Sequence, residues 1–115
     1  MQYMLLFYGN QAELMNMPRE DAMRFHGAFM AYTAALQEAG AYVSNLGLRP
    51  AADATTVRTV GGKLQVQDGP FAETREQLGG FYLIDVADLD AALSWAKRHP
   101  GAERGSVEVR PVWGS

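Results

Sequence analysis

Residues 68–82 read Asp68-Gly69-Pro70-Phe71-Ala72-Glu73-Thr74-Arg75-Glu76-Gln77-Leu78-Gly79-Gly80-Phe81-Tyr82. The Asp-Gly-Pro start is typical of a turn, because glycine reaches positive φ without a Cβ clash and proline fixes φ and lacks a donor. Two carboxylates, an aromatic ring and a guanidinium crowd into this connection: Asp68, Glu73, Phe71 and Arg75. Loops held by a rigid scaffold often carry binding and catalytic groups. This loop is therefore the first candidate for a functional site.

The segments on either side of this loop are predicted strands. Before it, Thr55–Val60 and Lys63–Gln67 are rich in β-forming residues and flank Gly61-Gly62, a pair that can adopt the primed turn of a β-hairpin. Apolar and polar residues alternate in the second arm, so we expect one face of the hairpin to be exposed to solvent. After the loop, Gly80–Val86 is typical of an apolar strand.

Farther from the loop, the pattern predicts two helices and three more strands. Pro18 and the acids after it suit a first helical turn, since proline costs nothing at N1 and acids favour the positive end of the helix dipole. The apolar arc of this helix includes His26, so we expect that histidine on the buried face. His99 falls at the end of the second helix, where a cation suits the dipole. The predicted elements are a strand over 3–8, a helix from Pro18 to about Ala39, a strand over Ala41–Leu48, a helix from Leu89 to about Arg98, and a strand over Ser106–Trp113.

This order of elements predicts an α+β fold, a ferredoxin-like sandwich with an inserted β-hairpin. Right-handed crossovers put both helices on one face of the sheet. The strands that begin at Tyr3 and Phe81 are apolar on both faces, so something else must cover the second face. A second copy of the chain is the simplest cover, which predicts a homodimer whose two sheets close on each other.

Length and composition set limits on the function. A chain of 115 residues with 48% hydrophobic content suits a single domain, residues 1–115. The absence of cysteine and the formal charge of -3 argue against disulfides, thiolate metal sites and nucleic-acid binding. The first apolar run stops at Gly9 and lacks a basic flank, so we expect no signal peptide, no membrane span and a cytoplasmic protein. No motif indicates a metal or another cofactor.

The same residues resemble a known family. Residues 68–82, the segment Thr55-Thr56-Val57-Arg58 and the segment Val107-Glu108-Val109-Arg110-Pro111 are similar to signatures of DGPF-type proteins in the YCII-related superfamily, over essentially the whole chain. The resemblance implies a dimeric α+β barrel. Some such proteins are encoded beside sigma factors of the extracytoplasmic-function type, and the wider superfamily includes a dehydrochlorinase with a proposed His-Asp pair. In that wider family a histidine ends an Arg-x-x-His pattern, whereas here Arg24 and His26 form Arg-x-His.

Three residues are candidates for acid-base catalysis: His26, Asp68 and Glu73. A neutral imidazole beside a carboxylate is a workable general base near neutral pH, although a lone histidine on an apolar arc is more often a buried polar residue with one hydrogen bond. Asp68 is either the carboxylate partner or a turn residue that binds nearby amides. Glu73 is either an acid of the site or a surface charge paired with Arg75.

Arg58, Phe71 and Arg110 are candidates for substrate binding. Each arginine lies in a strand and needs either solvent or an anion, because burying an unpaired charge is costly. If the arginines converge near Asp68, they form a clamp for a small carboxylate or phosphate. Alternatively, Glu108 shares a face with Arg110 and neutralises it. We prefer this structural pairing for Arg110 and leave both roles open for Arg58.

These residues lead to three hypotheses. The first is a small-molecule-binding domain, in its enzymatic form a cofactor-free catalyst of proton transfer on a small anionic substrate. The second is a regulatory or protein-interaction module, linked by the resemblance to extracytoplasmic-function sigma factors, which docks through the loop and the hairpin tip. The third is a purely structural loop that ties down the dimer. Polar side chains that converge in a closed pocket favour the first hypothesis, and outward-pointing ones favour the second.

Overall fold

The computed structural model describes residues 1–115, which form an α+β fold. Its elements are β1 (Gln2–Gly9), α1 (Gln11–Met15), α2 (Arg19–Glu38), β2 (Tyr42–Gly47), the 3-10 turn η1 (Ala51–Asp53), β3 (Thr55–Val60), β4 (Lys63–Asp68), β5 (Gln77–Asp85), α3 (Leu89–Arg98), the 3-10 turn η2 (Pro100–Glu103) and β6 (Gly105–Pro111). The main sheet is antiparallel, with the strand order β2-β5-β1-β6, which is compatible with a ferredoxin-like fold. None of the helices combines the length and the apolar character that a membrane crossing requires.

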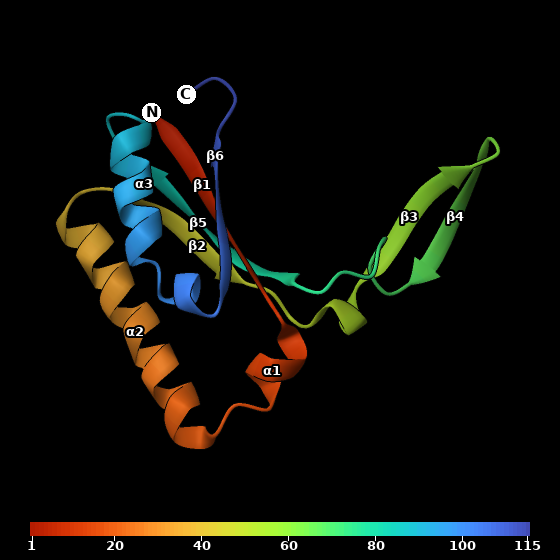
Figure 1. Ribbon diagram of the computed structural model, residues 1–115. Helices are drawn as coiled ribbons and strands as arrows, with labels where there is room; N and C mark the ends of the chain where they lie inside the picture. Colours follow the sequence, from red (N-terminus) through yellow and green to blue (C-terminus); the bar gives the residue numbers. More distant parts are fainter.

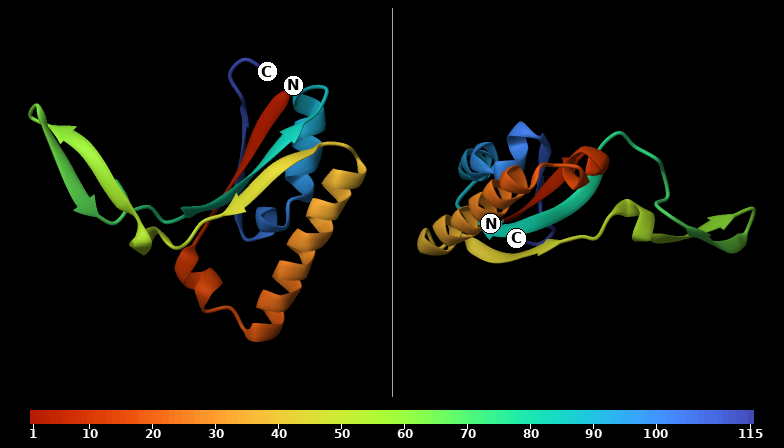
Figure 2. Two further views of the ribbon diagram at one scale, coloured as in Figure 1. Left: turned by 180° about the vertical axis from the view of Figure 1, so that it is seen from behind. Right: turned by 90° about the horizontal axis from the view of Figure 1, so that it is seen from below.

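The core lies between the helices and one face of the sheet. Helices α2 and α3 both cover that face, and the other face is open (Figures 1 and 2). Burial alternates along β1 because successive side chains point to opposite faces of a strand. Leu5 on β1, Ile84 on β5 and Leu36 on α2 are completely buried. Within a single chain, only one face of the sheet is therefore covered.

Helix α2 packs against the sheet mainly through its C-terminal half. Tyr32 and Leu36 are buried, whereas His26 and Met30 are exposed. The expectation that His26 lies on the buried face is wrong for this chain, because the N-terminal half of α2 diverges from the sheet (Figure 1). Helical periodicity identifies an apolar face but not how far a neighbouring sheet extends along it.

Strands β3 and β4 form a separate two-stranded sheet that projects from the body (Figure 1). At the turn, Gly61 and Gly62 have φ values of 57° and 80°, which a primed hairpin turn requires. The register places Val57 opposite Val66, so these side chains and Leu64 share one face of the hairpin. All three are more than 60% exposed, so this apolar face has no cover in a single chain.

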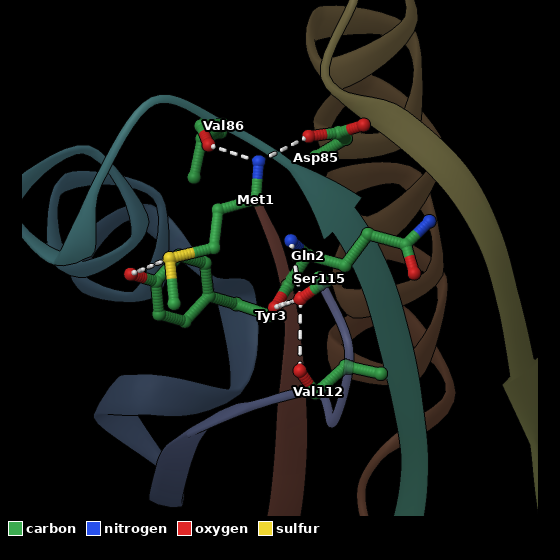
Figure 3. Close-up of polar contacts among 7 residues, drawn as sticks. All are labelled: Met1, Gln2, Tyr3, Asp85, Val86, Val112 and Ser115. Carbon is green, nitrogen blue, oxygen red and sulfur yellow. Dashed lines mark hydrogen bonds and ion pairs between the residues drawn. The ribbon is translucent and has the colours of Figure 1, made fainter.

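The two ends of the chain meet at one end of the sheet, as Figure 3 shows. The main-chain nitrogen of Met1 donates to Oδ1 of Asp85 at 2.9 Å. The amide of Gln2 donates to Oγ of Ser115 at 3.0 Å, and that hydroxyl donates to the carbonyl of Val112 at 2.8 Å. These contacts tie β1 to its neighbours at the end away from α1.

Candidate functional site

A cavity of about 780 Å³ lies between α2, α1 and the β2–β5 side of the sheet. Its wall is largely apolar and aromatic, and includes the rings of Phe7, Phe29 and Tyr82. Two histidines, His26 and His99, also line it. No aspartate, glutamate, lysine or arginine does. A cavity of this size, apolar with a few polar groups, has the usual character of a small-molecule site.

His99 is part of the cavity wall and is only 3% exposed. The prediction of a helix-end cation was wrong, because α3 ends at Arg98 and His99 adopts an extended conformation. Its Nδ1 accepts a hydrogen bond from the amide of Gly101 at 2.9 Å and so caps η2. Burial lowers the pKa of His99 to about 4, so the ring is neutral at pH 7. Four rings surround the imidazole with centroids between 5.2 and 5.7 Å away: Phe7, Phe29, Tyr32 and Tyr82.

A short hydrogen-bonded chain lies beside this histidine. Thr33 donates from Oγ1 to the carbonyl of Phe29 at 2.9 Å, and the hydroxyl oxygens of Thr33 and Tyr82 are 2.7 Å apart. Because a threonine hydroxyl has only one hydrogen, Tyr82 is the donor in the second bond. Burial raises the pKa of Tyr82, so its hydroxyl is protonated at neutral pH. The Tyr82 oxygen still has lone-pair capacity to accept a hydrogen bond.

The three predicted catalytic residues do not meet within one chain. His26 lines the α2 cavity, whereas Asp68 and Glu73 do not. Both carboxylates are exposed, and Asp68 ends β4, on the opposite side of the molecule from α2 (Figure 1). The ion pairs of the chain include none of the three. A His26-carboxylate pair is therefore absent from the single chain.

Two of the predicted binding residues do contact each other. Arg58 donates from Nη2 to the main-chain carbonyl of Phe71 at 2.8 Å, so its guanidinium helps to hold the loop. The ring of Phe71 is 73% exposed. Arg110 binds Glu108 instead, with Nε 2.9 Å from Oε2, and this hydrogen bond raises the pKa of Arg110. The structural pairing that we preferred for Arg110 is thus present.

A second, more open depression lies beside the loop over residues 70–78. Phe71, Glu76 and Glu108 contribute to its wall, together with Arg49. Arg49 already pairs with Asp53, with Nε 3.1 Å from Oδ2. This depression therefore offers acidic groups and no unpaired arginine, which makes it a poor anion site.

His99 and Tyr82 were not predicted as cavity residues. The basic pair before His99 made it resemble one more cation of a helix end. The available signal was Pro100-Gly101, which begins the η2 turn and needs a cap immediately before it. For Tyr82, the signal was its place between Gly80 and Ile84, since alternate residues of β5 face the helices.

Comparisons with known proteins agree with this fold. A protein-family model described as the YCII-related domain matches residues 1–114, which confirms the resemblance at the level of the superfamily. "Uncharacterized protein R00369" of Rhizobium meliloti (strain 1021) is 40% identical over 114 residues, which are 97% of this chain and 92% of that protein. Among solved structures, the 5-chloro-2-hydroxyhydroquinone dehydrochlorinase (TftG) from Burkholderia phenoliruptrix AC1100, in complex with 2,5-dihydroxybenzoquinone, is similar with a TM-score of 0.57. The match covers 100% of this chain and 96% of that chain at 12% identity, so it shows the fold alone.

Proposed function

The chain belongs to the YCII-related family, and from this premise we propose that it is a small-molecule-binding domain whose ligand occupies the cavity between α2 and the sheet. The observation that carries this proposal is the cavity of about 780 Å³, whose aromatic wall also contains the polar groups of Thr33, Tyr82 and His99. The solved neighbour is a complex with 2,5-dihydroxybenzoquinone, which supports a small ring compound as the class of ligand. The DGPF subtype stays a prediction.

The lining favours a neutral ligand over the anion predicted from the sequence. That anion was assigned to Arg58 and Arg110, and neither residue lines the cavity. An anion moved from water to this wall would lose hydration without gaining a countercharge. A ring compound with one or two hydrogen-bonding groups matches the wall better.

In an enzymatic form of this function, His26 acts as the general base at the cavity wall. Within one chain it has no carboxylate to orient it, because no aspartate or glutamate lines the α2 cavity. A complete acid-base pair then requires a carboxylate from a second copy, Asp68 or Glu73. The enzymatic form therefore depends on the homodimer, whereas ligand binding in the cavity does not.

A homodimer is the second part of the proposal. The open face of the sheet carries apolar residues from both central strands, and the register sets Met4 beside Leu83 and Leu6 beside Phe81. The apolar hairpin face adds a further uncovered surface. Contiguous apolar surfaces of this kind mark sites of association, and a symmetric pair of chains would cover the sheet of each with the other.

One observation favours the interaction module as an alternative function. Asp68, Glu73 and Arg58 are all exposed rather than gathered in a pocket, as docking through the loop would require. Under that alternative the α2 cavity has no ligand, so the same binding experiment separates the two functions.

The test is to block the α2 cavity and measure ligand binding by ligand-observed NMR with a library of neutral ring compounds. Ala34 lines the cavity, so Ala34→Trp should fill it and abolish binding. Ala31 is exposed on the same helix and lines a different depression, between α2 and α3, so Ala31→Trp is the matched control and should bind as the wild type does. Hits that bind both variants equally, or a library without hits, would contradict the proposed site.

A further inference from the structure

We infer that His99 presents a fixed Nε2–H donor to the α2 cavity and thereby selects ring compounds that carry a neutral oxygen acceptor such as a carbonyl. This inference rests on the proposed function, because it needs a ligand in that cavity. It assigns to His99 a role opposite to that of a general base: the ring gives a hydrogen bond and does not take a proton.

The tautomer follows from the cap of η2. Nδ1 of His99 accepts the hydrogen bond from the Gly101 amide at 2.9 Å, so this nitrogen has no hydrogen. A neutral imidazole must then carry its hydrogen on Nε2. The cap is closely packed, because Gly101 is buried and a Cβ there would lie 2.4 Å from ring atoms of Phe7. The chain thus fixes both the hydrogen and the direction of the ring.

Nε2 is the one polar atom of His99 without a partner. Nδ1 binds Gly101, and no hydrogen bond within the chain uses Nε2. No fully buried side-chain polar atom in the structure lacks a hydrogen-bond partner, so Nε2, which has none, is not completely buried. His99 lines both the α2 cavity and a depression between α2 and α3. Three of the four surrounding rings, Phe7, Phe29 and Tyr82, line the α2 cavity, and only Tyr32 lines the other.

The chemistry of the wall narrows the ligand further. A neutral donor in an apolar wall binds a carbonyl or ether oxygen without the desolvation that an ion would require. The aromatic rings around His99 supply contact for a flat apolar body. Tyr82, whose hydroxyl donates to Thr33, keeps acceptor capacity for a ligand hydroxyl nearby. Together they fit a ring compound with a carbonyl and, at most, a few hydroxyl groups.

The first test measures the tautomer of His99 without any ligand. In His26→Gln protein labelled with ¹⁵N-histidine, His99 is the only imidazole, and long-range ¹H–¹⁵N spectra distinguish the tautomers. We expect the neutral Nε2–H form between pH 6 and pH 8. A hydrogen on Nδ1, or an imidazolium at pH 7, would overturn the inference whatever the cavity binds.

The second test compares acetophenone with ethylbenzene, which has a similar shape but lacks the carbonyl. In His99→Asn the side-chain oxygen can still cap Gly101, but the donor at Nε2 is gone. We expect the wild type to bind acetophenone about three- to tenfold more tightly than ethylbenzene, and the variant to bind both equally. The inference would be contradicted, and the proposed function left intact, if the wild type bound both compounds without a preference for acetophenone or if that preference persisted in the variant. If neither compound shifts the signals of Thr33 and Phe29, the proposed function fails and this inference with it.

Discussion

The imidazole of His99 is buried without an ion-pair partner. The rings of Tyr32 and Tyr82 pack against this imidazole, and burial raises the pKa of both phenols. Tyr32 donates to the carbonyl of Trp95 at 2.6 Å and Tyr82 binds Thr33, so each hydroxyl has a partner. A wall of this kind orients a ligand through dipoles rather than through charge.

Acidification from pH 6.5 to pH 4 should lower the free energy of unfolding through His99. The unfolded chain binds a proton at the ordinary histidine pKa of 6.5, whereas the folded chain does so only near 4 because burial disfavours the cation. The resulting loss of unfolding free energy is absent above pH 7, grows as the pH falls, and reaches on the order of 3 kcal/mol at pH 4. Urea unfolding at pH 7 and pH 4.5 measures it, and His99→Asn should lose less stability on acidification. An equal loss in both proteins would contradict the prediction.

Gly80→Ala should destabilise the protein strongly. A Cβ at Gly80 would lie 2.5 Å from the main-chain oxygen of Leu46, and β2 cannot retreat without breaking its pairing with β5, so we expect a cost of about 3 kcal/mol. Gly27→Ala is the control, because nothing lies within 4 Å of that Cβ on α2, and it should stabilise the helix by about 0.5 to 1 kcal/mol. Chemical denaturation measures both changes, and similar values for the two variants would refute the steric argument.

At the level of the elements, strand β3 also holds the loop that follows β4. Thr56 donates from Oγ1 to the carbonyl of Gly69 at 2.8 Å, and Arg58 binds the carbonyl of Phe71. The amide of Gly69 in turn donates to the carbonyl of Ala54 at 2.7 Å. The polar groups near the Asp-Gly-Pro turn are therefore used to shape the loop within one chain.

Thr56→Val should loosen this loop without affecting the α2 cavity. The change keeps the side-chain shape but leaves the Gly69 carbonyl without its donor, which should cost about 1 kcal/mol. Amide hydrogen exchange over residues 69–73 should become faster, while acetophenone affinity stays unchanged. Thr59→Val on the same strand is the control, since Thr59 is exposed. Weaker binding in Thr56→Val alone would show that the loop and the cavity are coupled.

Elements with a strong local sequence pattern were predicted, and features set by tertiary packing were not. The strand predicted over 3–8 and the helix predicted from Leu89 to about Arg98 rest on local features, and the structure contains both, as β1 and α3. The short helix α1 was missed because its five residues, Gln11–Met15, bury no side chain and so leave no periodic signal. His26, expected on the buried face, is exposed, and His99, expected as a helix-end cation, is buried. Both differences have a tertiary cause, because neither helix alone determines where α2 leaves the sheet or where the chain turns after α3.

The whole chain is more open than its length predicts. Its radius of gyration is 16.0 Å, against about 13 Å for a compact domain of this size. Only 14 of the 115 residues are buried, so the core of one chain is small. The projecting hairpin and the open sheet face account for both observations. A second copy on the open face would enlarge the core without any change in the fold of the chain.

The protein should therefore be a dimer by light scattering at micromolar concentration, and its melting temperature should rise with concentration, because association stabilises the folded chain. Leu83 lies on the open face beside Met4, so Leu83→Lys would bury an unpaired charge in the dimer and should yield a monomer whose melting temperature is lower and independent of concentration. Leu93→Lys makes the same change on α3, where the side chain is already 36% exposed, and should leave the dimer intact. A monomeric wild type, or a Leu83→Lys variant that still dimerises, would contradict association through the sheet.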